Sequence, residues 1–230
     1  MKMKIVLRIG GSVLGSPPNS PIIKSYAEKI LNIKKRGHII AGIVGGGLLS
    51  REYIKISKDL DLSKKDQDII AILVSRLNAD IVARKIKLKK YNEVPINVLE
   101  LKHLLKENRI AIMGGLKPGM TTDTVAAIVA KSIQADLFIK ATNQEGVFTC
   151  DPKINPKAKK IDKLTYKEFI NISHKKHKPG IHTILDLKAI RILEESKIKT
   201  IILNGFNIDN IDKAIRSEKI GTKIIGDINE

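Results

Sequence analysis

The stretch Met113-Gly-Gly-Leu-Lys-Pro-Gly-Met-Thr-Thr-Asp123 lies between an apolar run at 109–113 and a second apolar run, Thr124-Val-Ala-Ala-Ile-Val-Ala130. This order predicts a strand, a glycine-rich turn and a helix. The three glycines let backbone N–H groups approach a ligand closely, and the Thr-Thr-Asp end offers caps for a helix N-terminus, where partial positive charge favours anions. The stretch therefore predicts a phosphate-binding turn. A turn that only joins a strand to a helix is the plainer alternative.

Two further glycine clusters follow predicted strands. One is Lys4-Ile-Val-Leu-Arg-Ile-Gly-Gly-Ser12, and the other is His38-Ile-Ile-Ala-Gly-Ile-Val-Gly-Gly-Gly47. In a parallel sheet covered by helices the carboxyl ends of the strands lie at one edge, so these turns are expected to converge on one crevice. None of them has the spacing of a Walker A loop or of the G-x-G-x-x-G dinucleotide fingerprint, so neither of those labels is supported.

Strand and helix patterns alternate along the chain, which predicts an α/β fold. Strands are expected at 4–9, 38–44, 109–113, 136–141 and 199–203, with weaker candidates at 94–98 and 223–225. A helix from Ser20-Pro21 to Gly37 has a cap, a first-turn proline and a terminal glycine. A second helix, 63–86, starts at the cap Ser63. We expect one apolar stripe of this helix to be buried, formed by Ile69, Ile70, Leu73, Leu77 and Ile81.

The composition favours one globular domain. The chain has 230 residues with 43% hydrophobic content, which is enough to bury a full core. The single cysteine, Cys150, cannot form an internal disulfide, and no apolar run approaches the roughly 18 residues of a membrane span. The start of the chain does not have the pattern of a signal-peptide core. We therefore expect a cytoplasmic protein with no membrane role.

The net charge of +18 raises the alternative of a nucleic-acid partner. The lysines are scattered, however, and the aromatic content is only 3% with no Trp, which disfavours the stacking surfaces of single-strand binders. We therefore expect no specific nucleic-acid partner and assign most lysines to solvated surface.

Two segments are expected to lie at the surface. Residues 146–164 hold two prolines and several lysines without periodicity, and Ser173-His-Lys-Lys-His-Lys-Pro-Gly-Ile-His182 is the most loop-like part of the chain. The three histidines of the second segment suggest a metal site, but no carboxylate or thiol completes a ligand set, so we expect no metal-ligating side chains there. A mobile basic loop that closes near phosphates is the better interpretation.

Taken together, the motifs resemble the amino acid kinase superfamily, and within it the uridine monophosphate kinases of the archaeal type. The resemblance spans nearly the whole chain, and its specificity lies in the order and spacing of the segments. They are Ile9-Gly-Gly-Ser12, Val44-Gly-Gly-Gly47 with Arg51 and Tyr53, Ser75-Arg-Leu-Asn-Ala79, Gly114-Gly115 with Pro118-Gly-Met-Thr-Thr-Asp123, Ala141-Thr-Asn-Gln-Glu-Gly-Val-Phe-Thr-Cys-Asp-Pro152, and Asp186-Leu-Lys-Ala189.

The resemblance implies an α/β three-layer sandwich with a mainly parallel central sheet. It implies one domain over residues 1–230, with a UMP-binding half at roughly 1–135 and an ATP-binding half at roughly 136–230. The implied reaction, in pyrimidine nucleotide biosynthesis, transfers the γ-phosphoryl group of ATP to UMP and yields UDP and ADP. Mg²⁺ would bind mainly through the ATP phosphates, and the chain would assemble as a homohexamer. Glycine-rich turns suit this chemistry, because phosphoryl transfer needs positioning and charge neutralisation more than covalent help.

The same resemblance implies the site residues. The catalytic residues are Arg8 and Asp186, and Asp186 is expected to orient the Arg8 cation. The ATP site is expected to use Gly10, Gly11, Ser12, Gly47, Arg51, Thr142, Asn143, Phe148 and Asp151. The UMP site is expected to use Gly46, Asp68, Leu116, Lys117, Pro118, Gly119, Met120, Thr121 and Thr122. Asp68 is suited to accept hydrogen bonds from ribose hydroxyls, and the two threonines to donate to the phosphate.

Three features depart from the pattern of the relatives. Arg8 stands where many of them have a lysine, and it keeps the charge on a longer, planar group. Gln144-Glu145 replaces the usual Val-Asp before Gly-Val-Phe, which moves the carboxylate one methylene further out. The His- and Lys-rich segment at 174–182 differs from the small residues usual at that place.

Two alternatives stay open at this point. Isopentenyl phosphate kinases of the same fold would keep the ATP half and change the acceptor pocket. They have a histidine beside the glycines after the second strand, whereas this chain has Val44-Gly-Gly-Gly47-Leu-Leu-Ser-Arg51. A regulator that responds to nucleotides or nucleic acid would keep the fold and lose catalysis, and it would show salt-sensitive DNA or RNA binding without ADP formation.

Overall fold

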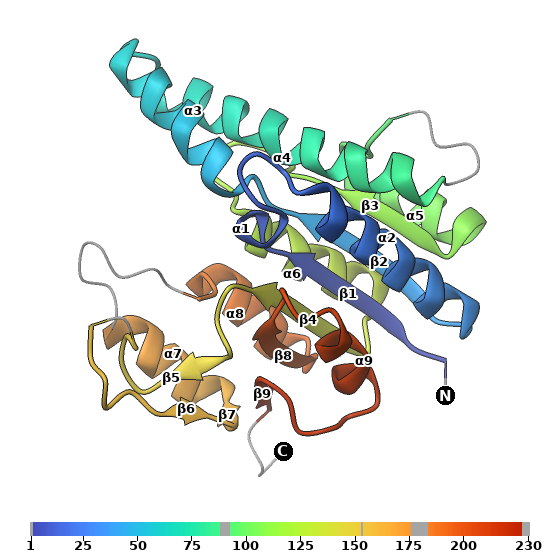
Figure 1. Cartoon of the computed structure of the whole chain (residues 1–230), viewed down its shortest axis with the longest axis vertical. Helices are drawn as coiled ribbons and strands as arrows, with labels where there is room; N and C mark the ends of the chain where they lie inside the picture. Colours follow the sequence, from blue (N-terminus) through green and yellow to red (C-terminus); the bar gives the residue numbers. More distant parts are fainter. Residues whose placement is uncertain (1, 88–92, 153, 176–183, 227–230) are drawn as a thin grey trace.

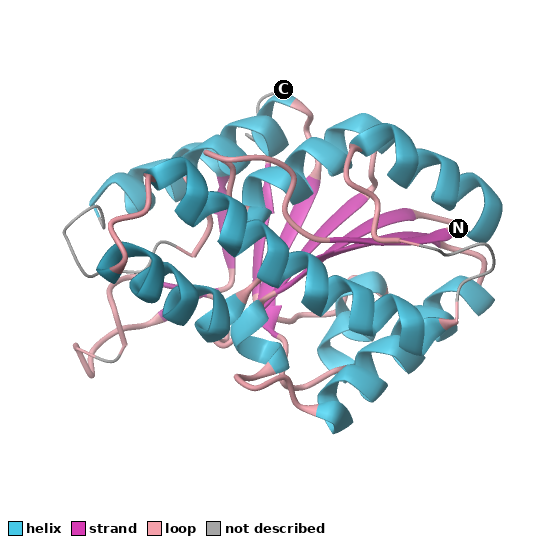
Figure 2. Ribbon diagram, turned by 90° about the horizontal axis from the view of Figure 1, so that it is seen from above, coloured by secondary structure: helices cyan, strands magenta, loops and turns pink. Residues whose placement is uncertain are grey.

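A single sheet runs through the middle of the molecule, with helices on both sides (Figures 1 and 2). The structure is a computed structural model that describes residues 2–87, 93–152, 154–175 and 184–226. Its strands are β1 (Lys4–Ile9), β2 (Ile39–Val44), β3 (Ile110–Met113), β4 (Leu137–Thr142), β5 (Val147–Phe148), β6 (Lys160–Ile161), β7 (Lys163–Thr165), β8 (Lys199–Asn204) and β9 (Thr222–Ile225). Its helices are α1 (Gly11–Leu14), α2 (Ser20–Lys35), α3 (Gly47–Asp59), α4 (Lys64–Ile86), α5 (Val98–Asn108), α6 (Thr122–Ile133), α7 (Tyr166–Lys175), α8 (Leu187–Glu195) and α9 (Asp209–Ile215).

The central sheet has the strand order β3-β2-β1-β4-β8-β9-β7. The pairs from β3 to β8 are parallel, and β9 joins β8 in the antiparallel sense. The chain moves outward from β1 through β2 to β3 and then crosses to β4 on the other side of β1. Such a reversal opens a crevice at the carboxyl ends of the two central strands, which is where open α/β sheets bind ligands.

Two apolar clusters cover the two faces of the sheet. One packs α1, α2, α4 and α9 against residues such as Leu7 and Ile9, and the other packs α5, α6, α7 and α8 against residues such as Val6 and Ile43. Successive strand residues point to opposite faces, so β1 and its neighbours supply both clusters and are buried on both sides. The predicted α/β three-layer sandwich with a mainly parallel sheet is confirmed.

Most predicted strands are present within a residue or so of the expected bounds. The five stronger candidates correspond to β1, β2, β3, β4 and β8, and the weak candidate at 223–225 is β9. The other weak candidate, 94–98, is wrong. Asn97 is the N-cap of α5 and its side chain accepts a hydrogen bond from Glu100 N at 2.9 Å, so the segment after Pro95 enters a helix.

The first long helix begins one residue earlier than the predicted cap, Ser20, indicated. Asn19 is the N-cap of α2, its side chain accepts from Ile22 N, and Ser20 is already helical. Pro21 lies in the first turn, where its missing N–H costs nothing, and Gly37 follows the helix with φ of 89°.

Helix α4 has its predicted bounds and cap but the opposite orientation from the one predicted. Ser63 caps it, while Leu73 and Leu77 of the expected buried stripe are 57% and 55% exposed. Ser75 and Asn78 are instead 2% exposed. The physical reason is that a different apolar stripe of α4, which includes Ala79, Val82 and Ile86, belongs to the core. The two polar residues on the same side meet two glycine turns, whose backbone groups need polar partners.

The two predicted surface segments contain some regular structure. Within 146–164, β5 and β6 form an antiparallel pair, and most residues after Cys150 are exposed. Helix α7 continues to Lys175, so the first three residues of the expected loop from Ser173 are helical instead. Residues 176–183, which hold most of the predicted basic loop, lie outside the described residues.

Within the described ranges, no helix combines the length and the apolar character that crossing a bilayer requires.

Candidate active site

Three glycine turns meet at the carboxyl edge of the sheet. Gly10 follows β1, Gly45 follows β2 and Gly114 follows β3, as the sequence predicts. The first two turns touch backbone to backbone, because a Cβ placed on Gly11 would lie 2.1 Å from Gly47 N. Gly47 itself has φ of 68°, a conformation that favours glycine. Only residues without side chains allow this close approach, which places the backbone of both turns at the crevice.

The larger of two cavities at this edge has a volume of about 540 Å³ and contains most of the predicted ATP site. Gly10, Gly11, Ser12, Gly47, Arg51, Thr142 and Asn143 line it. Two charged side chains of the central strands, Arg8 and Lys140, also face it, together with Asp123. The cavity is therefore a mostly polar pocket with glycine turns on one side and two cations at its base.

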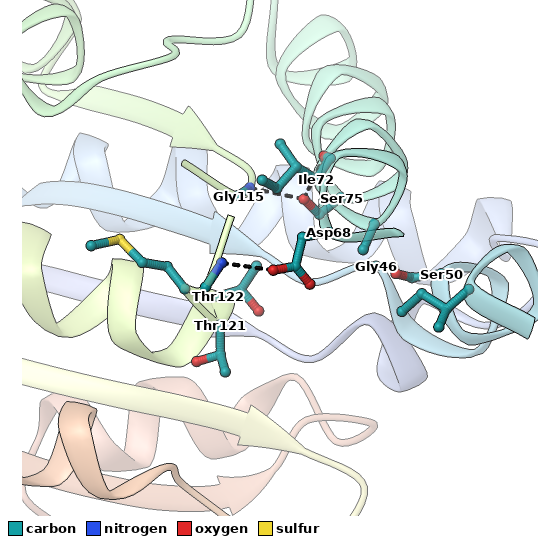
Figure 3. Close-up of a pocket in the computed structure, with 12 residues that line it drawn as sticks. Gly46, Ser50, Asp68, Ile72, Ser75, Gly115, Thr121 and Thr122 are labelled. Carbon is teal, nitrogen blue, oxygen red and sulfur yellow. Dashed lines mark hydrogen bonds between the residues drawn. The ribbon is translucent and has the colours of Figure 1, made fainter. Parts of the chain in front are cut away.

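The smaller cavity, of about 330 Å³, lies on the far side of the glycine turns and contains much of the predicted UMP site (Figure 3). The predicted residues that line it are Gly46, Asp68, Gly119, Met120, Thr121 and Thr122. Helices α3 and α4 add Ser50, Ile54, Ala71, Ile72 and Ser75. The two cavities are adjacent, because consecutive residues line them. Gly46 lines the smaller cavity and Gly47 the larger one, and likewise Thr122 lines the smaller cavity and Asp123 the larger one.

Helix α4 holds the turns around the smaller cavity in place. Ser75 Oγ accepts from Gly115 N at 2.8 Å, and Arg76 donates to the carbonyls of Gly115 and Leu116, both at 3.0 Å. Asn78 Nδ2 donates to Gly45 O at 3.0 Å. The polar residues of the Ser75–Ala79 motif thus shape two glycine turns from one helix face.

Asp68 reaches across the smaller cavity. Its Oδ2 accepts from Gly119 N at 2.7 Å, so the carboxylate fixes the turn before α6 while its other oxygen faces the cavity (Figure 3). This places an acceptor at the position where the sequence predicts contact with ribose hydroxyls.

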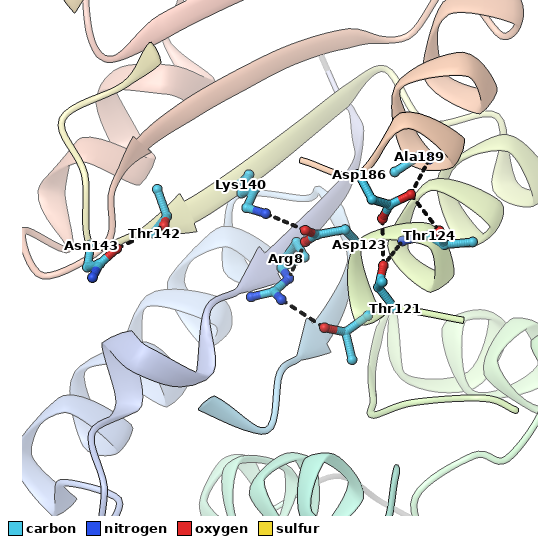
Figure 4. A network of polar contacts seen from close by, with 10 residues as sticks. Arg8, Thr121, Asp123, Thr124, Lys140, Thr142, Asn143, Asp186 and Ala189 are labelled. Carbon is cyan, nitrogen blue, oxygen red and sulfur yellow. Dashed lines mark hydrogen bonds and ion pairs between the residues drawn. The ribbon is translucent and has the colours of Figure 1, made fainter. Parts of the chain in front are cut away.

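Arg8 lies at the junction of the two cavities. Its Nη2 donates to Thr122 Oγ1 at 2.8 Å, and its Nε lies 2.6 Å from Asp123 Oδ1 (Figure 4). The other carboxylate oxygen of Asp123 pairs with Lys140 Nζ at 2.5 Å. Gly45 leaves room for the guanidinium, since a Cβ there would lie 3.1 Å from Arg8 Nη2. One buried carboxylate therefore holds two cations.

The electrostatics of this group follow from its burial and its pairing. Burial alone would raise the pKa of the Asp123 carboxyl, but the neighbouring Arg8 and Lys140 charges hold that pKa below its ordinary value. Burial lowers the pKa of Lys140 to about 8, while Asp123 acts in the opposite direction. Asp123 is thus ionised at neutral pH and Lys140 is mainly protonated.

The expected role of Asp186 toward Arg8 is not what the contacts show, since Asp123 holds Arg8. Asp186 caps α8 and accepts from Ala189 N at 2.9 Å. It also accepts from Thr121 Oγ1 at 2.5 Å and from Thr124 Oγ1 at 2.9 Å (Figure 4). The reason is geometric: Asp186 stands at the start of α8, which packs beside the start of α6, whereas Asp123 lies in the first turn of α6 and faces the strands. Asp186 therefore positions the threonine turn.

The sequence matches the model of the amino acid kinase family over residues 3–204. The chain belongs to the amino acid kinase family. It is similar to the uridylate kinase of Archaeoglobus fulgidus, with 40% identity over 96% of this chain and 100% of the relative. It is also similar to the uridylate kinase of Methanococcus vannielii, with 38% identity over 97% of this chain and 100% of the relative.

Solved structures agree with this membership. The crystal structure of the Archaeoglobus fulgidus uridylate kinase superposes with a TM-score of 0.88 and covers 96% of this chain and all of that one. The UMP kinase structure from Ureaplasma parvum, at 22% identity, has a TM-score of 0.80 over 98% of this chain and 99% of that one, which shows that the fold persists where the sequence has diverged.

Several predicted residues do not line either cavity of this amino acid kinase. Phe148 lies on β5 and Asp151 follows that strand, and Leu116, Lys117 and Pro118 belong to the turn between β3 and α6. Glu145, which departs from the relatives, accepts from Asn204 Nδ2 at 2.6 Å and so joins the ends of β4 and β8. The roles of these residues toward ligands remain predictions.

The most buried charged side chain of the site, Lys140, was not predicted from the sequence. Lys140 interrupts the apolar strand Leu137–Thr142 in the same way that Arg8 interrupts β1, and β1 pairs with β4 in a register that sets Arg8 opposite Lys140. A cation in the interior of each of two neighbouring buried strands is a signal that the sequence contains, and it can be recognised once the strands are known to be adjacent.

Proposed function

We propose that this chain is a uridylate kinase that transfers the γ-phosphoryl group of ATP to UMP, giving UDP and ADP. The observation that carries the proposal is the pair of adjacent cavities with Arg8 at their junction, in a chain whose full-length relatives are uridylate kinases. A donor nucleotide in the larger cavity and an acceptor nucleotide in the smaller one would bring their phosphates together at the Arg8 guanidinium.

The chemistry needs few protein groups. An oxygen of the UMP phosphate attacks the γ-phosphorus, the bond from that phosphorus to the β,γ-bridging oxygen breaks, and the electron pair stays on ADP. Because the second pKa of a phosphate monoester is about 6, the attacking oxygen carries no proton at neutral pH and no base is required. The protein supplies alignment through the glycine turns and positive charge through Arg8.

The residue assignments are part of the proposal. ATP phosphates would contact Gly10, Gly11, Ser12, Gly47 and Arg51, with Thr142, Asn143, Phe148 and Asp151 toward the nucleoside. UMP would contact Gly46, Asp68 and the turn from Leu116 to Thr122. The lining of the two cavities supports most of these positions, and the contacts of Asp186 support a positioning role for it rather than direct contact with Arg8.

Mg²⁺ would enter with ATP. Among the described residues no group of three or more His, Cys, Asp or Glu side chains is placed to hold a metal ion, and the Asp123 carboxylate is already paired with two cations. Coordination through the ATP phosphates fits such a site. Bound there, the ion would neutralise part of the phosphate charge. Location in the cytoplasm remains a prediction from the sequence.

Replacing Asp68 by Asn should raise the KM for UMP by about 10–100-fold, because hydrogen bonds to a charged acceptor contribute roughly 1.5–3 kcal/mol. Asparagine keeps an oxygen for the Gly119 N–H, so the turn should hold its shape. The KM for ATP should change by less than about two-fold, since the larger cavity does not include Asp68. Initial rates with either nucleotide varied test this, with Asp59→Asn at the exposed end of α3 as the control. A defect confined to ATP would contradict the placement of UMP.

We further propose assembly as a homohexamer, which the resemblance implies and the surface of α4 supports. Helices α3 and α4 lie side by side (Figure 1). The outward stripe of α4, formed by Ile69, Leu73, Leu77 and Ile81, is 37–57% exposed, and the exposed apolar residues of the α3 region are Leu48, Tyr53, Ile56, Leu60 and Leu62. Exposed apolar residues gathered on adjacent helices are typical of surfaces that bind another protein.

The double substitution Leu73→Glu with Leu77→Glu should therefore lower the molar mass measured by light scattering after size-exclusion chromatography. A charge placed in an apolar contact leaves an unpaired buried group, which disfavours association. Leu99→Glu is the matched control, because Leu99 is 67% exposed on α5, in the other helical layer. An unchanged mass in the double variant would contradict a subunit contact through α4.

The first experiment measures ADP release from ATP and Mg²⁺ with UMP, CMP, dUMP, isopentenyl phosphate, carbamate and acetylglutamate as acceptors. Selective turnover with UMP is the expected result. Turnover with a different acceptor only would keep the kinase family and overturn the UMP assignment. No turnover with any acceptor, together with salt-sensitive binding of DNA or RNA, would favour the regulator alternative.

A further inference from the structure

The two cations at the base of the larger cavity lie side by side on neighbouring strands. The parallel register pairs Arg8 of β1 with Lys140 of β4, so both side chains leave the sheet on the same face. The Lys140 side chain is only 6% exposed, and it nevertheless lines the cavity together with the glycine turns (Figure 4). A buried lysine whose ammonium group pairs with Asp123 thus borders the cavity proposed for the ATP phosphates.

The charges around Lys140 come from three elements. Asp123 of α6 pairs with it directly, Arg8 of β1 repels it, and Asp186 before α8 attracts it from further away. Both oxygens of Asp186 already accept hydrogen bonds from Thr121, Thr124 and Ala189. The group formed by Arg8, Asp123 and Lys140 carries one net positive charge at the base of the cavity.

A purely structural role explains this group poorly. Buried ion pairs contribute little net stability, because the cost of removing two charges from water offsets most of their attraction. The charges are also unbalanced: Asp123 pairs with Arg8 Nε at 2.6 Å and with Lys140 Nζ at 2.5 Å, so two cations share one carboxylate. An arrangement of two cations and one carboxylate facing a cavity is suited to an anionic ligand.

We propose that Lys140 is a second catalytic cation, which contacts the γ-phosphoryl group during transfer, and that Asp123 positions both Lys140 and Arg8. The proposal rests on the proposed phosphoryl transfer. Arg8 lines the larger cavity and also reaches the wall of the smaller one through Thr122, so it lies between the donor and the acceptor. Lys140 lines the larger cavity but not the smaller one, so it serves the donor side. Together they match the negative charge that spreads over the transferred group as its bond to ADP breaks.

The substitution Lys140→Met tests the proposal, because methionine keeps the length and removes the charge. The kcat should fall by about 10²–10³-fold, the range found when one transition-state donor is removed. The affinity for ADP with Mg²⁺, measured by calorimetry, should change by only a few-fold. Addition of aluminium fluoride and UMP, which mimics the transferred group, should tighten ADP binding in the wild type and do so far less in Lys140→Met. Lys131→Met is the control, since Lys131 lies on α6, 57% exposed and paired with Glu195.

A dependence on pH gives a separate readout. The kcat/KM for ATP of the wild type should fall as pH rises through about 8, because Lys140 loses its proton there. Lys140→Met should lack this fall. The same alkaline fall in the variant would assign it to another group and contradict the role of the Lys140 charge.

The outcomes separate a catalytic role from a structural one. A variant with a wild-type kcat overturns the proposal, and so does one whose response to aluminium fluoride is unchanged. If Lys140→Met does not fold, the double variant Asp123→Asn with Lys140→Met removes the buried pair together, and the proposal still requires a comparably low kcat in it. A wild type that forms no ADP with any acceptor would instead refute the proposed kinase function itself.

Discussion

Replacement of Arg8 by alanine should lower kcat by about 10²–10³-fold and change the KM for UMP by only a few-fold. The guanidinium lies where the two cavities meet, with Nη2 on Thr122 and Nε beside Asp123, so its charge acts on the group in flight more than on either bound nucleotide. Interactions made only in the transition state reduce kcat when they are lost, and those made equally in the ground state raise KM. Steady-state kinetics with each nucleotide varied separates the two effects.

Two further variants are needed to interpret the kinetics of Arg8→Ala. Arg84→Ala, at a side chain 64% exposed on α4, controls for the loss of an arginine as such and should retain wild-type kinetics. Arg8→Lys restores the cation that many relatives carry but not the bidentate fork, so it should recover only part of the rate. A wild-type kcat in Arg8→Ala would end the assignment of this residue to the chemistry.

Replacement of Gly11 by alanine should both destabilise the fold and abolish ATP-dependent turnover. The new Cβ would lie 2.1 Å from Gly47 N and 2.6 Å from Gly45 O, which are backbone atoms that cannot rotate away. The glycine turns after β1 and β2 would have to separate. We expect a loss of roughly 2–4 kcal/mol in the free energy of unfolding, which for a chain of this size lowers Tm by roughly 5–15 °C.

Gly226→Ala is the matched control, because a Cβ at Gly226 meets no atom within 4 Å. Thermal unfolding followed by circular dichroism, with and without ATP, measures both the stability and the binding. The Gly11→Ala variant should gain much less stability from ATP than the wild type does, since the backbone donors would no longer face one ligand. An equal gain in both proteins would show that the contact between the turns is not part of the ATP site.

The layout of the fold was predictable from the sequence because it depends on features that the sequence displays directly. Apolar runs ending in glycines indicated the central strands and the edge where they converge, and Ser63 marked the start of α4 correctly. The short strands β5, β6 and β7 were not predictable, since two or three residues are too few to show a period. At 94–98 a run of apolar residues hid the cap at Asn97, which the hydrogen bond to Glu100 N reveals.

The candidate site was predictable in its turns and less so in its charges. The sequence indicated the glycines of both cavities, because a backbone can approach a phosphate closely only where residues have no side chain. It did not reveal that Asp123 rather than Asp186 pairs with Arg8, because that choice depends on how α6 and α8 pack. The direction in which α4 faces was equally hidden: the spacing of Leu73 and Leu77 defines a stripe and does not say which side of the helix meets the sheet.

The few polar residues on the inner side of α4 also limit what could be transplanted from this protein. The turns after β2 and β3 accept hydrogen bonds from Arg76 and Asn78 and donate one to Ser75, and these residues are 32–40 positions away from their partners in the sequence. A peptide or grafted loop that copied only Val44–Gly47 or Met113–Asp123 would lack that template and would sample many conformations. To rebuild this edge of the sheet in another scaffold, a designer would have to transfer α4 and the turns after β2 and β3 together.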